Sequence, residues 1–261
     1  MITLLTDTII GILIPFFGTF IGASVVLFSR KDFNSSLQGM LCGFAAGVMV
    51  AASVWSLLIP AMEHSDDMGA LAFVPAIVGF WLGIALVFVS ERLVLNFGAK
   101  GYCKNQNSFR RTLITAAAVT LHNFPEGMAV GVVYSGLISG DENASIASAL
   151  ALSVGIAIQN LPEGAVVSLP LHASGVGRTR SFALGVLSGV VEPFGALLTL
   201  LLSAWFVPAL PYFLSFAAGA MMYVVADELI PAVKDSGRPE AGMLIFAIGF
   251  SLMMSLDVVF G

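Results

Sequence analysis

A six-residue pattern occurs twice in the middle of the chain, as HNFPEG at residues 122–127 and as QNLPEG at residues 159–164. Each copy sets an amide, a proline and a glutamate inside a stretch that is otherwise largely apolar. Carboxylates are rare in apolar segments of membrane proteins and mark functional sites where they occur. The two copies are therefore the first guide to both the fold and the chemistry of the chain.

The composition indicates what surrounds the two copies. The chain of 261 residues is 58% hydrophobic and only 10% charged, with a mean hydropathy of +0.96. Because a soluble domain carries about 25% charged residues, most of this chain is expected to be solvated by lipid. The net charge of -5 and the scattered basic residues give no support to nucleic-acid binding. Cys42 lies in an apolar run and Cys103 in a polar loop, so no disulfide framework is indicated.

Eight apolar stretches are long enough to cross a bilayer, which takes about 20 residues in a helix. Helices are expected rather than strands because backbone groups in lipid must form their hydrogen bonds within the segment. The sequence therefore predicts an all-α polytopic membrane protein with a single transmembrane domain over residues 1–261. The expected spans lie near residues 3–28, 36–62, 70–95, 112–138, 145–170, 180–205, 210–233 and 240–260.

The basic residues predict the orientation of these spans. All 11 Lys and Arg residues fall in the connections that follow the first, third, fifth and seventh spans. Because cytoplasmic loops are enriched in Lys and Arg, these connections are expected to be cytoplasmic and both termini extracytoplasmic. The first span follows no positively charged segment, so we expect it to be retained and not cleaved as a signal peptide.

A second repeat indicates an inverted topology. FAAG at 44–47 is followed by IPA at 59–61, and FAAG at 216–219 is followed by IPA at 230–232. The two members of each repeat are expected to cross the membrane in opposite directions, as in transporters with a midplane site. Chance recurrence of the short FAAG motif is an alternative, whereas the longer pattern around each glutamate is harder to explain by chance.

Three glutamates, Glu126, Glu163 and Glu192, lie near the middle of their predicted spans. A carboxylate at the bilayer centre costs about 2.5–3.5 kcal/mol, and no Lys or Arg accompanies these acids inside a span. Their charge must therefore be balanced by protons or by a bound metal cation. Protonated acids with a structural role are the simpler explanation for Glu192 alone, but not for the three together.

The residues beside the acids favour a metal ion. On a helix, His122 and Glu126 share a face, and the second copy of the pattern repeats this geometry in span five. If the two helices face each other, they bring an imidazole, amide oxygens and carboxylates together. Such ligands suit Zn²⁺, Fe²⁺ and Mn²⁺, and the lack of a thiolate argues against Cu(I). The candidate metal ligands are His122, Asn123, Glu126, Gln159, Asn160, Glu163 and Glu192.

Pro125 and Pro162 are expected to interrupt the two helices next to these ligands. A proline inside a helix removes a hydrogen bond and frees the carbonyl four residues earlier. The glycine after each glutamate is expected to loosen the same turn. Such a break is tolerated in a membrane where it lines a polar cavity, and a plain packing kink is the alternative.

At these residues the sequence resembles the ZIP (Zrt/Irt-like) metal-transporter family, in its bacterial GufA-like branch. The resemblance covers essentially the whole chain and rests on HNFPEG, QNLPEG and the Glu192-Pro193 pair in span six. It implies a transporter and not an enzyme, carrying zinc or alternatively iron, manganese, cobalt or cadmium toward the cytoplasm. It also implies a homodimer in the lipid bilayer of a bacterial inner membrane.

The resemblance further implies two metal ions at the midplane. Many members have His where this chain has Gln159, and some have Asp where it has Asn160, so both positions offer weaker ligands here. Sliding of one helix bundle against another has been proposed for the family, and spans four and five with two, six or seven are candidates for one bundle. The implied ligands are His122, Glu126, Gln159 and Glu163 for one metal, and Asn123, Asn160 and Glu192 for the other, with Glu126 and Glu163 bridging.

Other acids mark candidate ends of the transport path. Glu63 and His64, followed by Asp66 and Asp67, cluster at the outer end of span two and could attract cations, although a solvated loop is an equal alternative. Asp257, near the outer end of span eight, resembles an entrance aspartate of the family. The candidate metal exit, with a structural role as its alternative, consists of Asp227 and Glu228.

Two other classes of function share buried acids with a metal transporter. An intramembrane metal-dependent hydrolase is one, but the HExxH and GxSxG patterns of such enzymes are absent from the sequence. A proton-coupled carrier of small organic cations is the other, and competition by zinc for its site would distinguish it. The inverted repeat favours transport over hydrolysis.

Overall fold

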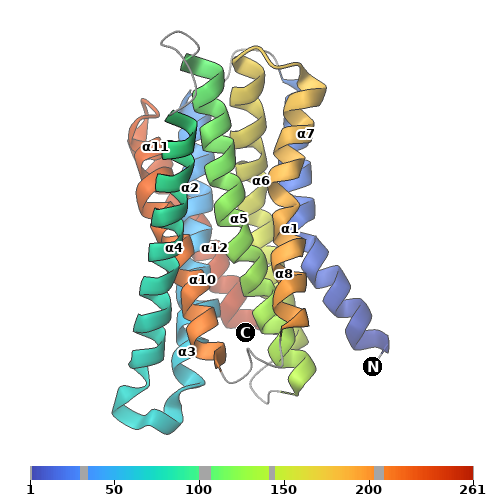
Figure 1. Ribbon diagram of the computed structural model, residues 1–261, viewed down its shortest axis with the longest axis vertical. Helices are drawn as coiled ribbons and strands as arrows, with labels where there is room; N and C mark the ends of the chain where they lie inside the picture. The colour runs from blue at the N-terminus through green and yellow to red at the C-terminus, as the bar shows by residue number, and fades with distance from the viewer. Residues whose placement is uncertain (1, 30–34, 100–106, 141–144, 203–208, 261) are drawn as a thin grey trace.

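The structure is a computed structural model that describes residues 2–29, 35–99, 107–140, 145–202 and 209–260 (Figure 1). Within these ranges, the side chains of 2–3, 91, 94–99, 107–119, 121–122 and 260 are not described. Every regular element in the described ranges is helical. The expectation of an all-α chain is therefore confirmed.

Seven segments of the described chain are long and apolar enough to cross a membrane. They are Leu4–Phe28, Ser35–Glu63, Phe73–Ser90, Ile146–Ala173, Arg178–Leu201, Leu210–Lys234 and Pro239–Val259. The helix α5 (Asn107–Ser139), which has 33 residues, lies where the fourth of the eight expected spans was predicted. The chain is thus a polytopic membrane protein, while the exact span count and the side of the termini stay predictions.

The long helices form two groups that lie side by side (Figure 1). The first bundle contains α1 (Ile2–Phe28), α5, α6 (Ile146–Ala173), α7 (Arg178–Gly189) and α8 (Val191–Leu201). The second bundle contains α2 (Ser35–Ala52), α4 (Phe73–Ala99), α10 (Leu210–Val224) and α12 (Pro239–Phe260), with short extensions of α2 and α10. The fourth and fifth spans pack with the sixth and the first, and they also contact the second and the seventh across the boundary between the bundles. Which helices move together stays a prediction.

In the second bundle, α2 and α12 are held together by two matching glycine contacts. Gly47 lies so close to the carbonyl of Phe246 that a Cβ could not fit, and Gly249 lies equally close to the carbonyl of Phe44. Each helix therefore contributes the sequence Phe-x-x-Gly, with its phenylalanine carbonyl and its glycine facing the partner helix. Backbones of membrane helices approach this closely only where small residues permit it.

The pairing of α4 with α10 repeats this arrangement. Gly83 lies against the carbonyl of Phe216, and Gly219 lies against the carbonyl of Phe80. The FAAG repeat is thus one half of a contact that occurs twice, in α2 with α12 and in α10 with α4. We call these four Phe-x-x-Gly segments the glycine clasps. Their correspondence is what an inverted repeat requires.

The IPA motifs explain a second shared feature of α2 and α10. Each helix widens into a π-helical turn, η1 (Ser53–Leu58) and η4 (Val225–Leu229), before it continues as α3 (Ile59–Glu63) and α11 (Ile230–Lys234). The proline of each motif lacks an N–H and its ring collides with the carbonyl four residues earlier, so a wider turn relieves the collision. The two short helices α3 and α11 lie at opposite ends of the molecule (Figure 1).

The connection after α3 differs slightly from the prediction for span three. Residues Asp66–Leu71 form a 3₁₀ helix, η2, in which Gly69 adopts a positive φ of 58°. That conformation is available to glycine at little cost but strained for other residues. The membrane-crossing helix therefore starts at Phe73 and not near residue 70.

Candidate metal centre

The three predicted glutamates lie inside the first bundle, on α5, α6 and α8. Glu126 is 0% exposed, Glu192 is 1% exposed and Glu163 is 4% exposed. The carboxylate of Glu126 lies close enough to those of Glu163 and Glu192 for the three charges to repel one another. Three acids gathered in one buried volume need positive charge from protons or from a cation.

Glu192 accepts hydrogen bonds from three different helices. Thr19 Oγ1 in α1 donates to Oε1 over 2.8 Å, and Asn160 Nδ2 in α6 donates to Oε2 over 2.8 Å. Asn123 Nδ2 in α5 makes a longer contact of 3.3 Å to Oε1. These neutral donors orient the carboxylate without neutralising its charge, so it can still serve as a ligand for a cation.

Glu126 accepts a hydrogen bond from the opposite helix of the pair. Gln159 Nε2 in α6 donates to Oε1 of Glu126 over 2.7 Å. The bond crosses between the two copies of the PEG pattern and brings residues of α5 and α6 into direct contact. The contact fits the expectation that the two copies converge on one volume.

Several oxygens of the same side chains are buried and take no part in these hydrogen bonds. Within the described part of the chain, Oδ1 of Asn123, Oε2 of Glu126, Oε1 of Gln159 and Oδ1 of Asn160 are buried and accept no hydrogen bond. Buried polar atoms without a partner are uncommon and need an explanation. Three of them are amide oxygens whose nitrogens already donate hydrogen bonds elsewhere, and the fourth is a carboxylate oxygen. Such a set suits a cation that accepts oxygen ligands.

The prolines and glycines of the two patterns behave differently from the expectation. Both α5 and α6 stay helical through Pro125 and Pro162, so neither helix breaks open at the site. Gly127 and Gly164 do not serve as loose turns; each lies against a backbone carbonyl of a neighbouring helix, where a Cβ could not fit. These glycines let α8 and α1 approach closely enough to place their side chains among the ligands.

The remaining predicted ligand, His122, has a side chain outside the described part of the structure. Among the side chains that are described, no three from His, Cys, Asp and Glu lie close enough together to hold a metal ion by themselves. The donor set in view is therefore mixed, with carboxylates supplemented by the amides of Asn123, Gln159 and Asn160. A mixed set of this kind agrees with the weaker ligands noted at Gln159 and Asn160.

The three candidate entrance residues lie around a common cavity. Glu63, His64 and Asp257 line a volume of about 330 Å³ at the end of the molecule that contains α3. Asp257 accepts a hydrogen bond of 2.5 Å from Ser56, which lies in the π-turn of α2. Asp66 and Asp67 are exposed on the adjoining turn.

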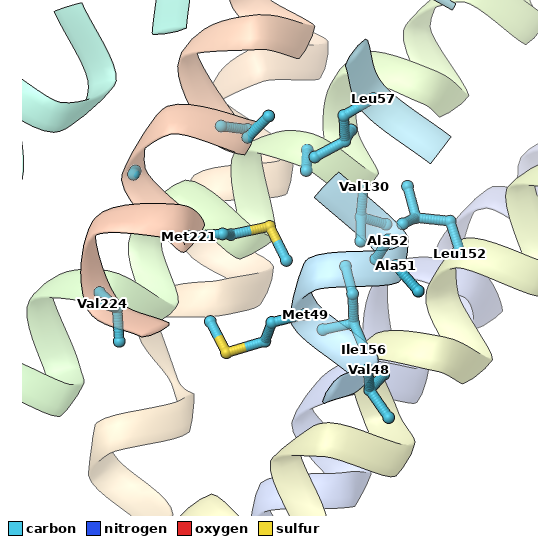
Figure 2. Close-up of a cluster of buried hydrophobic side chains, with 14 of the residues drawn as sticks. Val48, Met49, Ala51, Ala52, Leu57, Val130, Leu152, Ile156, Met221 and Val224 are labelled. Atoms are coloured by element: carbon cyan, nitrogen blue, oxygen red, sulfur yellow. The ribbon is translucent and has the colours of Figure 1, made fainter. Parts of the chain in front are cut away.

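A layer of apolar side chains separates this cavity from the amides and carboxylates. Leu152 of α6 lines the cavity, Ile156 lies one turn further along, and Gln159 follows on the next turn. Figure 2 shows Ile156 near Met49 of α2 and Met221 of α10, in a cluster that joins the two bundles. We call this cluster the apolar layer. Along α6, this cluster lies between the cavity and Gln159.

The candidate exit residues lie toward the opposite end. Asp227 and Glu228 belong to the π-turn η4 of α10, and Asp227 is exposed whereas Glu228 is half-buried. Ser56 and Asp227 each precede the proline of an IPA motif by four residues. The π-turn that holds Ser56, the partner of Asp257, therefore corresponds in the inverted repeat to the π-turn that carries the exit candidates.

Comparison with known proteins identifies the family. A sequence model described as ZIP zinc transporter matches residues 98–257. The chain is 34% identical to zinc transporter ZIP11 of Xenopus tropicalis, over 98% of this chain and 97% of that protein. It is 35% identical to ZIP11 of Homo sapiens, over 92% and 93%. It is 33% identical to zinc transporter GufA of Myxococcus xanthus, over 93% and 94%. The chain belongs to the ZIP zinc transporter family.

Proposed function

We propose that the chain is one transmembrane domain that carries divalent metal ions across a bacterial inner membrane toward the cytoplasm. Zinc is the first candidate because the relatives are named zinc transporters; iron, manganese, cobalt and cadmium share its preference for mixed nitrogen and oxygen ligands. The observation that carries the proposal is the set of buried, unpartnered oxygens beside three buried carboxylates. Family membership supports transport over the intramembrane hydrolase.

The proposed binding site holds two metal ions. The amide nitrogens already donate to carboxylates, which leaves the amide oxygens in position to face a cation without rotation of the side chains. A metal bound there would satisfy the unpartnered oxygens and offset the repulsion among the acids. We assign His122, Glu126, Gln159 and Glu163 to one ion and Asn123, Asn160 and Glu192 to the other, with Glu126 and Glu163 shared.

The proposed path runs from the cavity at Glu63, His64 and Asp257 to the midplane ligands and then to Asp227 and Glu228. Carboxylates around the cavity would raise the local concentration of cations. The apolar layer must open for an ion to pass, and it is formed by side chains from both bundles. A relative movement of the two bundles would therefore connect the ligands first to one side and then to the other. We propose that the protein works as a homodimer.

Zinc uptake into proteoliposomes tests the site. Glu126→Gln and Glu163→Gln each remove a charged ligand while keeping the size of the side chain, so both variants should lose most of their transport of ⁶⁵Zn²⁺. Glu240→Gln is the matched control, because it makes the same chemical change at an exposed position at the start of α12. The assignment is wrong if the two midplane variants carry zinc as fast as the control.

Competition for bound ⁶⁵Zn²⁺ distinguishes a metal transporter from a carrier of organic cations. Unlabelled zinc should displace ⁶⁵Zn²⁺ from the purified protein, whereas tetramethylammonium should not at the same concentration. Displacement by the organic cation, with no effect of Glu126→Gln on zinc binding, would favour the organic-cation carrier.

A further inference from the structure

Thr19 of α1 makes an unusual contact at the candidate metal centre. Its side chain is completely buried and its Oγ1 donates to Oε1 of Glu192 over 2.8 Å. A threonine in a helix commonly donates to the carbonyl four residues earlier, as Thr8 of the same helix does over 2.8 Å. Thr19 points to Glu192 instead, and the carbonyl four residues before it, that of Pro15, accepts from Asn160 Nδ2 at 3.3 Å.

The packing of α1 on α6 matches the packing of α8 on α5. Gly164, in the second copy of the PEG pattern, lies against the carbonyl of Thr19. Gly127, at the same place in the first copy, lies against the carbonyl of Glu192. The two copies of the pattern therefore select Thr19 and Glu192 as equivalent positions on their partner helices.

The correspondence continues one turn further along both partner helices. Gly22, three residues after Thr19 in α1, lies against the carbonyl of Leu161. Gly195, the residue at the same spacing in α8, lies against the carbonyl of Phe124. Leu161 and Phe124 themselves hold the same place in QNLPEG and HNFPEG.

The correspondence also holds one turn earlier, and there it involves the ligands. Asn160 Nδ2 donates to the carbonyl of Pro15 at 3.3 Å, and Asn123 Nδ2 donates to the carbonyl of Ser188 at 3.0 Å. Pro15 and Ser188 lie four residues before the two equivalent positions. Three independent contacts thus relate α1 to the segment formed by the end of α7 and by α8, and the inverted repeat places a hydroxyl where its other half has a carboxylate.

We propose that Thr19 is a positioning residue for Glu192, and that its hydroxyl fixes this carboxylate in the orientation that binds metal; the proposal rests on the proposed function. A hydroxyl can donate to the carboxylate across the repeat, whereas a second carboxylate there would repel it. The other hydrogen bond to Oε1 comes from Nδ2 of Asn123 over 3.3 Å, and the same nitrogen also donates to the carbonyl of Ser188. Thr19 therefore provides the shorter of these two hydrogen bonds to Oε1.

The role of Thr19 is separable from its packing. A Cβ at Gly189 of α7 would lie 2.8 Å from both Cβ and Cγ2 of Thr19, so the methyl side of the threonine fills a tight space. Valine keeps that shape and loses the hydroxyl, whereas serine keeps the hydroxyl and loses the methyl. A hydrogen-bonding role and a packing role therefore predict opposite rankings of Thr19→Val and Thr19→Ser.

Equilibrium binding of ⁶⁵Zn²⁺ to the purified full chain measures the ranking. Thr19→Val should weaken zinc binding by about 10–100-fold, the range found when partners that orient metal ligands are removed. Thr19→Ser should bind zinc like the parent. Thr8→Val is the matched control, because Thr8 is an equally buried threonine of α1 whose hydroxyl bonds locally, and it should not change the affinity. In a Glu192→Gln background, Thr19→Val should add little, because the two residues act as a unit.

Each outcome decides the proposal. Parent-like zinc affinity in Thr19→Val, or loss in Thr19→Ser with retention in Thr19→Val, overturns it. Additive losses in the double variant overturn it as well. Should Thr19→Val fold poorly, Thr19→Ala in place of it gives the same comparison against Thr19→Ser. The proposed function fails separately, if Glu126→Gln and Glu163→Gln bind and carry zinc like the parent.

Discussion

Replacing Gly47 by alanine tests the glycine clasps, on which the second bundle depends. A Cβ at this position would overlap the carbonyl oxygen of Phe246 and lie 2.7 Å from the backbone nitrogen of Phe250. Neither atom belongs to a side chain that could rotate away, so α2 and α12 would have to move apart. Gly219 likewise lies against backbone atoms, the carbonyl of Phe80 foremost, so its replacement should have a similar effect.

The magnitude follows from the kind of overlap. Overpacking a well-packed core costs about 1–3 kcal/mol, and a collision between backbones belongs at the upper end of that range. A gap of 0.5–1 Å between two surfaces already forfeits about a quarter to a half of their dispersion energy, which adds to the cost along the whole α2–α12 contact. At about 3 kcal/mol, the midpoint of thermal unfolding should fall by roughly 6–12 °C for a protein of this size.

Thermal unfolding of the purified protein in detergent, followed by intrinsic fluorescence, measures the shift. Gly177→Ala is the control, because a Cβ at Gly177 meets no atom within 4 Å and its φ of -62° suits any residue. Gly47→Ala and Gly219→Ala should both unfold well below this control and close to each other. Midpoints equal to that of Gly177→Ala would refute the close approach of the backbones. Strongly unequal midpoints for the two variants would refute the equivalence of the two helix pairs, α2 with α12 and α10 with α4.

Two further changes test the path and the ligands. Asp257→Asn should raise the KM for zinc uptake several-fold with little change in the maximal rate, because the cavity loses a charge that attracts cations; an unchanged KM in proteoliposomes would exclude Asp257 from the entrance. Asn160→Asp should tighten zinc binding, because a carboxylate replaces a neutral amide oxygen, and should lower the zinc-free midpoint of unfolding, because a further charge is buried without a counter-charge; weaker zinc binding measured at equilibrium would argue against Asn160 as a ligand.

The features visible in the sequence were those set by the bilayer and by buried charge. Length and hydropathy predicted the spans, and the family read from HNFPEG and QNLPEG is confirmed by the comparisons. The glutamates could be singled out because a carboxylate in an apolar segment is rare whatever its neighbours are. The bounds of α2 with α3, and of α10 with α11, agree with the predicted spans to within a residue or so.

The features that escaped the sequence depend on contacts between distant segments. Thr19 lies in an apolar stretch of α1, well after Asp7, the one acid of that helix, and a threonine there is ordinarily satisfied by its own backbone. Only its contact with Glu192 distinguishes it from Thr8, and no pattern in the sequence placed the first span beside the fourth and fifth. The prolines indicated irregular helices, but whether a helix widens, as at Pro60, or continues, as at Pro125, depends on the packing around it.

The bundles and the boundary between them resist deformation to different degrees. In the bundle of α2, α4, α10 and α12, glycines lie directly against backbone carbonyls of the neighbouring helix. Because these backbone contacts are so close, neighbouring helices cannot slide past one another by small displacements. The boundary between the bundles includes the unbranched thioethers of Met49 and Met221, which have three rotatable bonds and can adopt many shapes at similar energy. When two rigid bundles are joined by a deformable boundary, strain concentrates at the boundary. The lowest-energy deformation of this protein should therefore rearrange the side chains of Met49 and Met221.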